Sequence, residues 1–283
     1  DTNDMAGFFY TLHRLSPEGG RLPSWMSTHP DPGERVGNVQ ALTTQWQGQT
    51  TGPYSEKREE FLRVIDGLVF GQDPREGFVR GSTFHHPQLK FRFPVPQGWQ
   101  LQNGKSQVLM VSPEQDAGVI FQAAQGSSPQ QAADAFIAQE GITALDRDPV
   151  TIAGGSGVRT LVRVASQSQG ADQIVVSTWF AYGGGQWVFH GITTEPSYTA
   201  RRPALVTPPD GFAAETDPAI LNVKPIRLKV VSAPHDGRFR DVAANFPIPD
   251  GAAITDIEGL AILNGVESDS SVRKGTLLKV LTQ

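Results

Sequence analysis

Apolar residues in the first quarter of the chain are spaced as they are on one face of a helix. The pattern runs from Met5 to Leu15, resumes from Glu34 to Trp46, and returns between Ser55 and Gly67. A period of about 3.6 residues places these apolar side chains along one side of each helix. We therefore expect residues 1–75 to form a helical N-terminal segment.

Residues 80–215 follow a different pattern. The run Leu89-Lys90-Phe91-Arg92-Phe93 alternates between apolar and charged residues, which is typical of a strand with one buried face. A helix is predicted to begin at Ser128-Pro129 and to end before Gly141. Further strands are predicted at residues 107–112, 117–123, 157–165, 173–182 and 185–192. Together they predict an α+β domain in which helices pack on an antiparallel sheet.

The remaining residues, 223–283, form a third zone. A connection over residues 201–222 precedes it, rich in proline and expected to hold only short helical turns. Within the third zone the pattern predicts a strand, two helices and a strand, at residues 226–231, 239–246, 257–263 and 276–281. The sequence thus predicts three domains, at 1–75, 80–215 and 223–283, the last a small βααβ unit.

Composition removes several classes of function. The chain has 283 residues, with 24 Lys and Arg against 29 Asp and Glu, and a formal net charge of −5. A mildly acidic chain without a basic block argues against nucleic acid as a partner. No stretch approaches the ~18 consecutive apolar residues of a transmembrane segment. Cysteine is absent, which excludes disulfides, thiolate metal sites and cysteine nucleophiles.

The residues alone contain no complete catalytic site. No two of the six histidines stand at the i, i+4 spacing of an HExxH zinc motif. His85 and His86 are adjacent and would face opposite sides of a strand, so a loop leading into the sheet is the simpler interpretation. No Gly-x-Ser-x-Gly motif marks a nucleophile. An independent hydrolase, the least favoured hypothesis, would use groups such as Asp236 or His190.

Three segments carry resemblances to known families. Met5-Ala6-Gly7-Phe8-Phe9, followed by Pro23-Ser24-Trp25-Met26-Ser27-Thr28-His29-Pro30 and Glu34-Arg35, resembles the end of a periplasmic HExxH zinc metallopeptidase domain. The family is the gluzincin type that includes CaaX prenyl proteases and β-barrel-assembly-enhancing proteases. Its zinc helix and its third ligand, a glutamate, both precede this point, and this chain contains neither. The resemblance implies zinc in the full-length protein and no cofactor in this part of it.

The metallopeptidase resemblance assigns roles to two residues. His29 corresponds to a His-Pro histidine that in some members reaches the metal, where a neutral imidazole can occupy the open fourth position. Arg35 corresponds to an arginine that pairs with the carboxylate near the third ligand and so orients it. Neither residue would hold zinc in this chain by itself.

The other two resemblances concern the middle and last zones. Residues 91–99, followed by strands and a helix, resemble the Mog1/PsbP-like fold, whose members are mostly binding or assembly modules. Residues 236–243, 260–265 and 273–280 resemble the first helix, second helix and closing strand of a LysM module, without its Gly-Asp-Thr signature.

Two hypotheses of function follow. The favoured one is a non-catalytic accessory region of a secreted or periplasmic zinc metalloendopeptidase homologue, inactive alone, which binds substrates or envelope proteins. Its catalytic core would lie upstream of this sequence. The alternative is a free-standing cell-envelope binding module without a protease parent, with protein or peptidoglycan as its ligand. Under the favoured hypothesis, the absence of the helices that residues 1–46 pack against would expose Phe8, Phe9 and Trp25 and would favour repacking or self-association.

Overall fold

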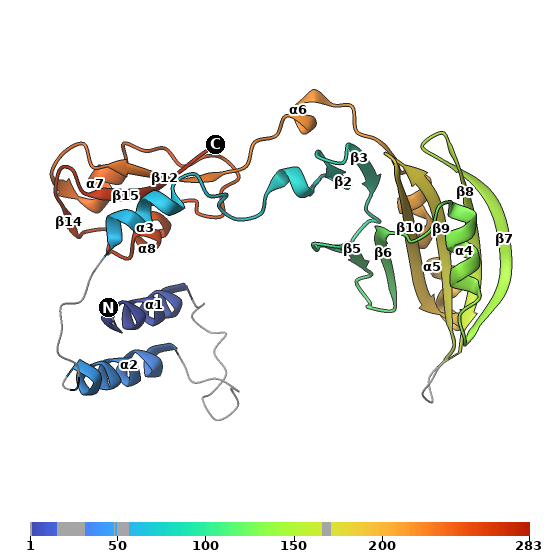
Figure 1. Cartoon of the computed structure of the whole chain (residues 1–283), viewed down its shortest axis with the longest axis horizontal. Coiled ribbons are helices and arrows are strands. Elements are labelled where there is room, and N and C mark those ends of the chain that lie inside the picture. The colour runs from blue at the N-terminus through green and yellow to red at the C-terminus, as the bar shows by residue number, and fades with distance from the viewer. Residues whose placement is uncertain (1, 16–31, 48, 50–56, 166–170) are drawn as a thin grey trace. The chain divides into compact units, whose positions relative to one another are not determined.

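The computed structural model describes residues 2–15, 32–47, 49, 57–165 and 171–283 (Figure 1). It divides into two compact units, residues 73–224 and residues 1–72 together with 225–283. The second unit is therefore discontinuous in the sequence, and the residues just before position 73 belong with the C-terminal residues. The α+β fold class is confirmed by the helices and antiparallel sheets of both units.

The 73–224 unit is built on a seven-stranded antiparallel sheet, in the order β4-β5-β6-β10-β9-β8-β7. Its strands are β4 (Gln100–Asn103), β5 (Gln107–Val111), β6 (Ala117–Ala123), β7 (Ile142–Ile152), β8 (Gly155–Val164), β9 (Gln173–Tyr182) and β10 (Gly185–Thr194). A smaller antiparallel sheet has the order β1 (Phe78–Arg80), β2 (Thr83–His86), β3 (Phe91–Pro94) and β11 (Ala213–Ala214). Every strand of the large sheet that was predicted from alternation is present.

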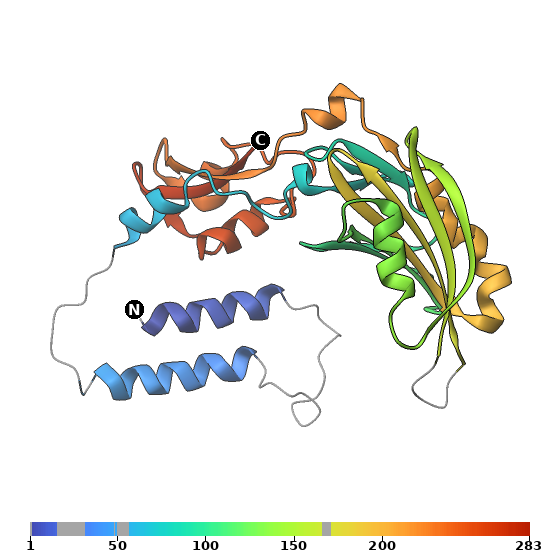
Figure 2. The same ribbon diagram turned by 45° about the vertical axis from the view of Figure 1, so that its right-hand side comes forward.

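Helices pack on both faces of the large sheet (Figure 2). Helix α4 (Pro129–Ile137) covers one face and buries Ala132 and Ala133 against Val158, Trp179 and Val188. Ser128 caps it by accepting a hydrogen bond from the backbone N–H of Gln131. The other face carries helix α5 (Tyr198–Asp210) and the smaller sheet.

Phenylalanine rings fill the space between the two sheets. The side chains of Phe84, Phe91 and Phe93 on the small sheet and of Phe121 and Phe189 on the large sheet are almost fully buried. The ring centroids of Phe121 and Phe189 are 4.4 Å apart, and those of Phe84 and Phe93 are 4.9 Å apart. Such offset and edge-to-face contacts add to the free energy gained from burial alone. This aromatic layer fixes the two sheets against each other.

Helix α5 is longer than the short helical turns predicted for residues 201–222. It contains Pro203, Pro208 and Pro209, residues that normally break a helix interior. Its packing compensates, since Leu205 lies directly over Gly191 of β10, where an added Cβ would come within 2.8 Å of the leucine. Arg201 also pairs with Asp116 at 3.0 Å. Tertiary contacts therefore override the local preference of the prolines.

The C-terminal residues follow the predicted order of strand, helix, helix and strand. Antiparallel β12 (Arg227–Ser232) and β15 (Leu277–Thr282) enclose helices α7 (Phe239–Ala243) and α8 (Ile257–Asn264). The short strand β13 (Gly237–Arg238) directly precedes α7, and β14 (Ser271–Val272) follows α8. The two strands pair in an antiparallel manner. Phe239, Val242, Leu260, Ala261 and Leu278 form the centre of a separate core.

Residues from before the 73–224 unit complete this C-terminal unit. Helix α3 (Arg58–Ile65) ends at Asp66, whose carboxylate accepts hydrogen bonds from the backbone N–H of Val230 at 2.8 Å and from Lys229 Nζ at 2.9 Å. Residues 67–70 then run beside β12 and exchange backbone hydrogen bonds with residues 226 and 228. The two-stranded sheet of β12 and β15 is thus extended along its β12 edge by residues that are distant in the sequence.

The side-chain amide of Asn264 forms hydrogen bonds with both backbone polar groups of Lys279 in β15. Asn264, at the end of α8, donates through Nδ2 to the carbonyl of Lys279 and accepts at Oδ1 from its backbone N–H, both at 2.8 Å. The next residue, Gly265, is left-handed with φ 70°, which ends the helix. The Asn264 side chain therefore takes the place of a neighbouring strand.

Replacing Asn264 with alanine is expected to lower the free energy of unfolding of this unit by about 1–3 kcal/mol, the cost of leaving backbone groups without partners. Chemical denaturation of the full chain would measure it. Asn245→Ala is the matched control, because the exposed Asn245 amide bonds only at the end of its own helix and to His235. An equal loss of unfolding free energy in the two variants would contradict the role given to the Asn264 side chain.

The first two helices form a hairpin. Helices α1 (Thr2–Leu15) and α2 (Pro32–Gln47) pack on each other, and the guanidinium carbon of Arg35 lies 5.4 Å from the centroid of the Phe9 ring. Large apolar side chains stay exposed on both helices, namely Met5, Phe8, Tyr10, Leu42 and Trp46. No described helix of the chain combines the length and apolar character needed to cross a membrane.

Candidate functional site

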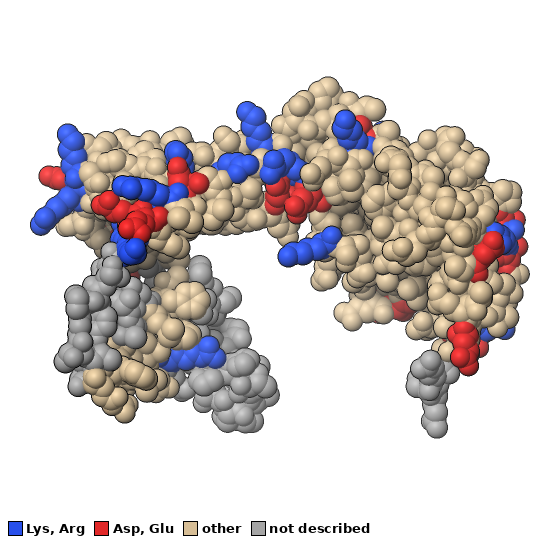
Figure 3. Space-filling view, in the orientation of Figure 1, with Lys and Arg blue, Asp and Glu red and all other residues tan. Residues whose placement is uncertain are grey.

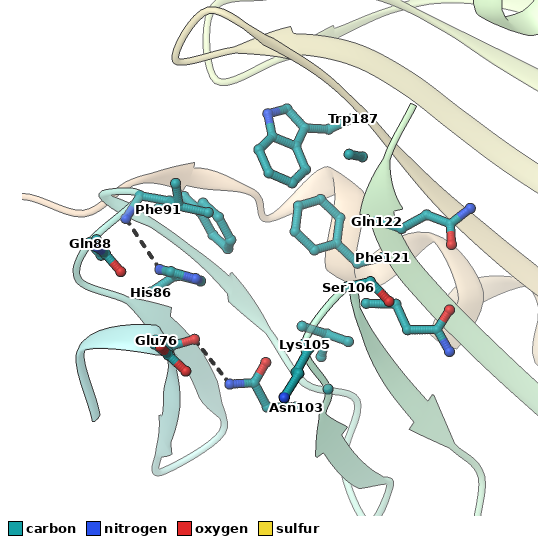
Figure 4. Close-up of a pocket in the computed structure, with 15 residues that line it drawn as sticks. Glu76, His86, Gln88, Phe91, Asn103, Lys105, Ser106, Phe121, Gln122 and Trp187 are labelled. Atoms are coloured by element: carbon teal, nitrogen blue, oxygen red, sulfur yellow. Dashed lines mark hydrogen bonds between the residues drawn. The ribbon is translucent and has the colours of Figure 1, made fainter. Parts of the chain in front are cut away.

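An open cleft of about 780 Å³ lies between the two sheets of the 73–224 unit (Figure 4). One side is formed by Glu76 and by the turn between β2 and β3, and the other by the turn between β4 and β5. Its volume falls within the about 300–1,000 Å³ of typical ligand sites. The cleft exists because the aromatic layer between the sheets ends here without a residue to cover it.

Aromatic rings form the floor of the cleft. Trp187 of β10 stacks on Phe121 of β6 with centroids 5.2 Å apart and planes at 17°, and Phe91 of β3 meets both rings at steeper angles. The indole Nε1–H of Trp187 donates to the carbonyl of Tyr182 at 3.0 Å. Because this polar group is already bonded, the half-buried indole offers carbon surface to the cleft.

His86 projects into the cleft from β2 (Figure 4). Its Nδ1 accepts a hydrogen bond from the backbone N–H of Leu89 at 3.2 Å, so the neutral ring carries its proton on Nε2. Burial lowers the pKa of His86, although the nearby Glu76 carboxylate acts in the opposite direction. The imidazole is therefore neutral at pH 7 and presents one N–H donor. This residue was expected in a loop, whereas it lies on a strand.

Asn103, at the end of β4, lies across the cleft from His86 (Figure 4). Its Nδ2 donates to the carbonyls of Glu76 at 3.0 Å and Gly77 at 3.4 Å. These bonds fix the orientation of the amide, and Oδ1 receives no hydrogen bond from the residues that the structure describes. His86 thus offers an oriented donor and Asn103 an oriented acceptor above the apolar floor, in a cleft that the side chains of Gln88, Ser106, Gln107 and Gln122 also line.

The mouth of the cleft carries one charge of each sign. Glu76 and Lys105 are both exposed there, and Leu89 adds an apolar lip that is 45% exposed. Figure 3 shows Lys and Arg side chains interspersed with Asp and Glu on the face in view, and wide areas of the 73–224 unit with neither. The local charges balance, so the cleft has no built-in preference for a strongly charged ligand.

His85, the neighbour of His86, faces the opposite side of β2 and is structural. Its Nδ1–H donates to Glu215 Oε2 at 2.5 Å, with 10% and 2% of the two side chains exposed. Burial acts to raise the pKa of the Glu215 carboxyl. Hydrogen bonds from the backbone N–H of Asp217, from His85 and from the backbone N–H of Thr216 outweigh it, so this pKa lies below its ordinary value. The pair joins β2 to the chain after β11.

His190 and Asp236 do not form an active site in the structure. His190 Nδ1 is 2.8 Å from the hydroxyl of Ser177, but Ser177 is fully buried and Phe136 of α4 lies over the imidazole at 5.1 Å. Burial lowers the pKa of His190 to about 4. Asp236 accepts a hydrogen bond from the backbone N–H of Lys274 and so stabilises a loop of the other unit. A substrate has no access to the Ser177 hydroxyl.

Of the two residues singled out by the metallopeptidase resemblance, the structure describes only Arg35. His29 lies outside the described residues, and Arg35 contacts the Phe9 ring within the helical hairpin. Among the described histidines, aspartates and glutamates, no three gather in an arrangement that could hold a metal ion. The described donors therefore do not fit a zinc site.

No protein-family model matches the sequence, and no curated protein matches it significantly. Solved structures match it with 12–13% sequence identity. Cyanobacterial PsbP from Synechocystis gives a TM-score of 0.35 over 49% of this chain and 96% of that one. The Ran-binding protein Mog1p from Saccharomyces cerevisiae gives 0.36, over 48% and 96%. LpqN of Mycobacterium tuberculosis, described as involved in cell envelope biogenesis, gives 0.35, over 58% and 100%. These are likenesses of fold.

Sequence reasoning did not find the cleft. Aromatic residues that alternate along strands, as Phe91 and Trp187 do, are typical of a core, and Phe91 is indeed buried, but both residues also lie on the floor of the cleft. The signal available in the sequence was weak, because Asn103 and His86 are brought together only by the packing of two separate sheets. Adjacent histidines on alternating faces of a strand were the one local clue.

Proposed function

We propose that this chain is a protein-binding accessory region of a larger cell-envelope protein, and that the cleft of the 73–224 unit binds an extended segment of a partner polypeptide. The observation that carries the proposal is the open cleft itself, with an exposed Trp187 face on its floor and oriented polar groups on its walls. Apolar floors with a few fixed polar groups are typical of binding sites. Catalysis is not part of the proposal.

The parent protein proposed is a secreted or periplasmic zinc metallopeptidase homologue. In support, the α1–α2 hairpin leaves Phe8, Leu42 and Trp46 exposed, as expected of helices whose apolar faces normally pack on further protein. Zinc would then be held by residues outside this chain. Envelope proteins are the partners proposed, and peptidoglycan is the alternative ligand for the βααβ residues 223–283 because of their LysM-like order of elements.

Two exposed leucines of the 73–224 unit allow a controlled test. Leu89, 45% exposed, lies at the lip of the cleft, and Leu145 on β7 is 43% exposed and does not line it. A fluorescently labelled, reduced and carboxymethylated lactalbumin, which cannot refold, serves as the extended polypeptide. Leu89→Ser in the full chain is expected to weaken its binding about fivefold, the loss of about 1 kcal/mol of apolar burial.

Fluorescence anisotropy measures this binding, and Leu145→Ser should leave it unchanged. Binding that responds equally to both substitutions would place the interaction elsewhere on the chain. The absence of any binding by the wild-type protein would overturn the proposed function.

A further inference from the structure

We propose that the cleft recognises one uncharged peptide unit together with the bulky apolar side chain beside it: the side chain rests on Trp187, and His86 and Asn103 bond the peptide group. This inference rests on the proposed function and specifies the chemistry of the bound segment. The cleft would then select extended, uncharged segments that contain a large apolar residue.

The apolar part of the ligand follows from the floor. The Trp187 indole has its only polar group bonded to Tyr182, and Phe121 and Phe91 support it from below and from the side. A polar ligand group placed on this surface would lose its water and gain no hydrogen bond. A large aliphatic or aromatic side chain loses nothing there and buries its own surface.

The peptide part follows from the walls. The Nε2–H of neutral His86 is a donor, and Asn103 Oδ1, held by the bonds of its amide to Glu76 and Gly77, is an acceptor. A peptide unit carries one carbonyl and one N–H, so it satisfies both walls at once. A carboxylate or phosphate would satisfy His86 only and would leave the Asn103 oxygen facing a negative charge.

The absence of a dominant charge completes the argument. Only Glu76 and Lys105 among the residues that line the cleft carry full charges, and they oppose each other. A strongly acidic segment would be repelled by Glu76 as much as Lys105 attracts it, and a strongly basic segment would meet the reverse, so neither gains net attraction to offset its lost hydration. The bound segment is therefore uncharged on both sides of its apolar residue.

A synthetic heptapeptide provides the test. Its ends are acetylated and amidated, and a central phenylalanine is flanked by glycine, asparagine and serine. Binding to the full chain is measured by fluorescence anisotropy and by the shift of the Trp187 indole N–H signal in NMR. We expect at least a fivefold weaker affinity when the phenylalanine is replaced by alanine, and again when both peptide nitrogens beside it are methylated so that no N–H remains for Asn103.

Two protein variants connect these effects to the walls of the cleft. His86→Phe keeps a ring between Phe84 and Phe91 but removes the N–H, and it should weaken the phenylalanine peptide about fivefold or more. Leu145→Ser should change nothing. Thermal melting of each variant shows whether the 73–224 unit remains folded.

Each further outcome has a defined meaning. The acetylated amide of phenylalanine carries the apolar side chain with a peptide unit on each side, so it should also bind in the cleft, and the inference is wrong if it does not bind there. It is also wrong if the alanine peptide binds equally well. If unfolded lactalbumin binds in a Leu89-dependent manner while the neutral heptapeptide does not, the proposed function stands and only the inference fails. If neither probe binds, both fail.

Discussion

Replacing Phe93 with alanine is expected to lower the free energy of unfolding of the 73–224 unit by about 3–5 kcal/mol, the usual cost of removing a buried phenylalanine. Phe93 is fully buried, and its ring lies 4.9 Å from Phe84, 5.4 Å from Phe121 and 5.2 Å from Phe189. It therefore connects the small sheet to the large one, and its loss leaves a cavity between them. Differential scanning calorimetry of the full chain would measure the effect.

The calorimetric trace contains its own control. The core around Phe239 and Leu260 consists of residues of the other unit, so its transition should stay where it is in the wild-type protein. Phe93→Leu, which keeps much of the apolar volume, should cost clearly less than Phe93→Ala. A single transition that moves as a whole, or a loss below about 1 kcal/mol, would contradict the expectation.

The second large effect is expected at Glu215. Replacing it with alanine should destabilise the same unit by about 3 kcal/mol or more, because several donors in this buried site lose the acceptor they share. The substitution leaves the His85 imidazole and the backbone N–H groups of Thr216 and Asp217 without their acceptor. Glu215→Gln keeps an acceptor oxygen for those N–H groups and should cost less. Urea denaturation at pH 7 compares the two variants.

The pH dependence separates the charge from the hydrogen bonds. The pKa of the Glu215 carboxyl is lower in the folded protein than its ordinary value of 4.5. Its contribution to stability is therefore complete above about pH 4.5 and is lost as the pH falls through the folded pKa. Between pH 7 and pH 3 the wild-type unit should lose stability more steeply than Glu215→Gln. Parallel curves for the two proteins would show that the carboxylate charge contributes nothing.

The carboxyl of Asp116 also contributes to the pH dependence of stability, equally in the wild-type protein and in Glu215→Gln. Burial acts to raise the pKa of Asp116, but hydrogen bonds from Arg201 and Ser112 keep it below its ordinary value. Asp116 is present in both proteins, so it contributes the same slope to both curves. Only the difference between the curves reports on Glu215.

Local patterns predicted most of the regular elements, because their information lies within a few residues. The glycines at 183–185 join the two predicted strands β9 and β10, with positive φ at Gly183 and Gly184. The predicted strand at 107–112 and helix between Ser128 and Gly141 correspond to β5 and α4. Where apolar periodicity, caps and turns agree, the element is found within a few residues of its prediction.

The elements that were missed depend on distant contacts. Strand β7 was not predicted because its residues carry no apolar alternation. It is an edge strand that pairs with β8 and is exposed along most of its length. Helix α5 escaped because its prolines argue against a helix, and only its packing over Gly191 shows why it forms. The cleft escaped for the same reason, since His86 and Asn103 lie on strands of different sheets.

The backbone bonds of residues 67–70 to residues 226 and 228 have a consequence for synthesis of the chain. On the ribosome, α3 and residues 67–70 emerge well before β12. They therefore cannot form their backbone hydrogen bonds to residues 226 and 228 until the whole 73–224 insert has been made. The insert has its own core and can fold first. A chain that ends at residue 224 should therefore contain a folded 73–224 unit, while residues 67–70 lack their backbone partners. Residues 225–283 expressed alone would lack the segment that pairs with β12.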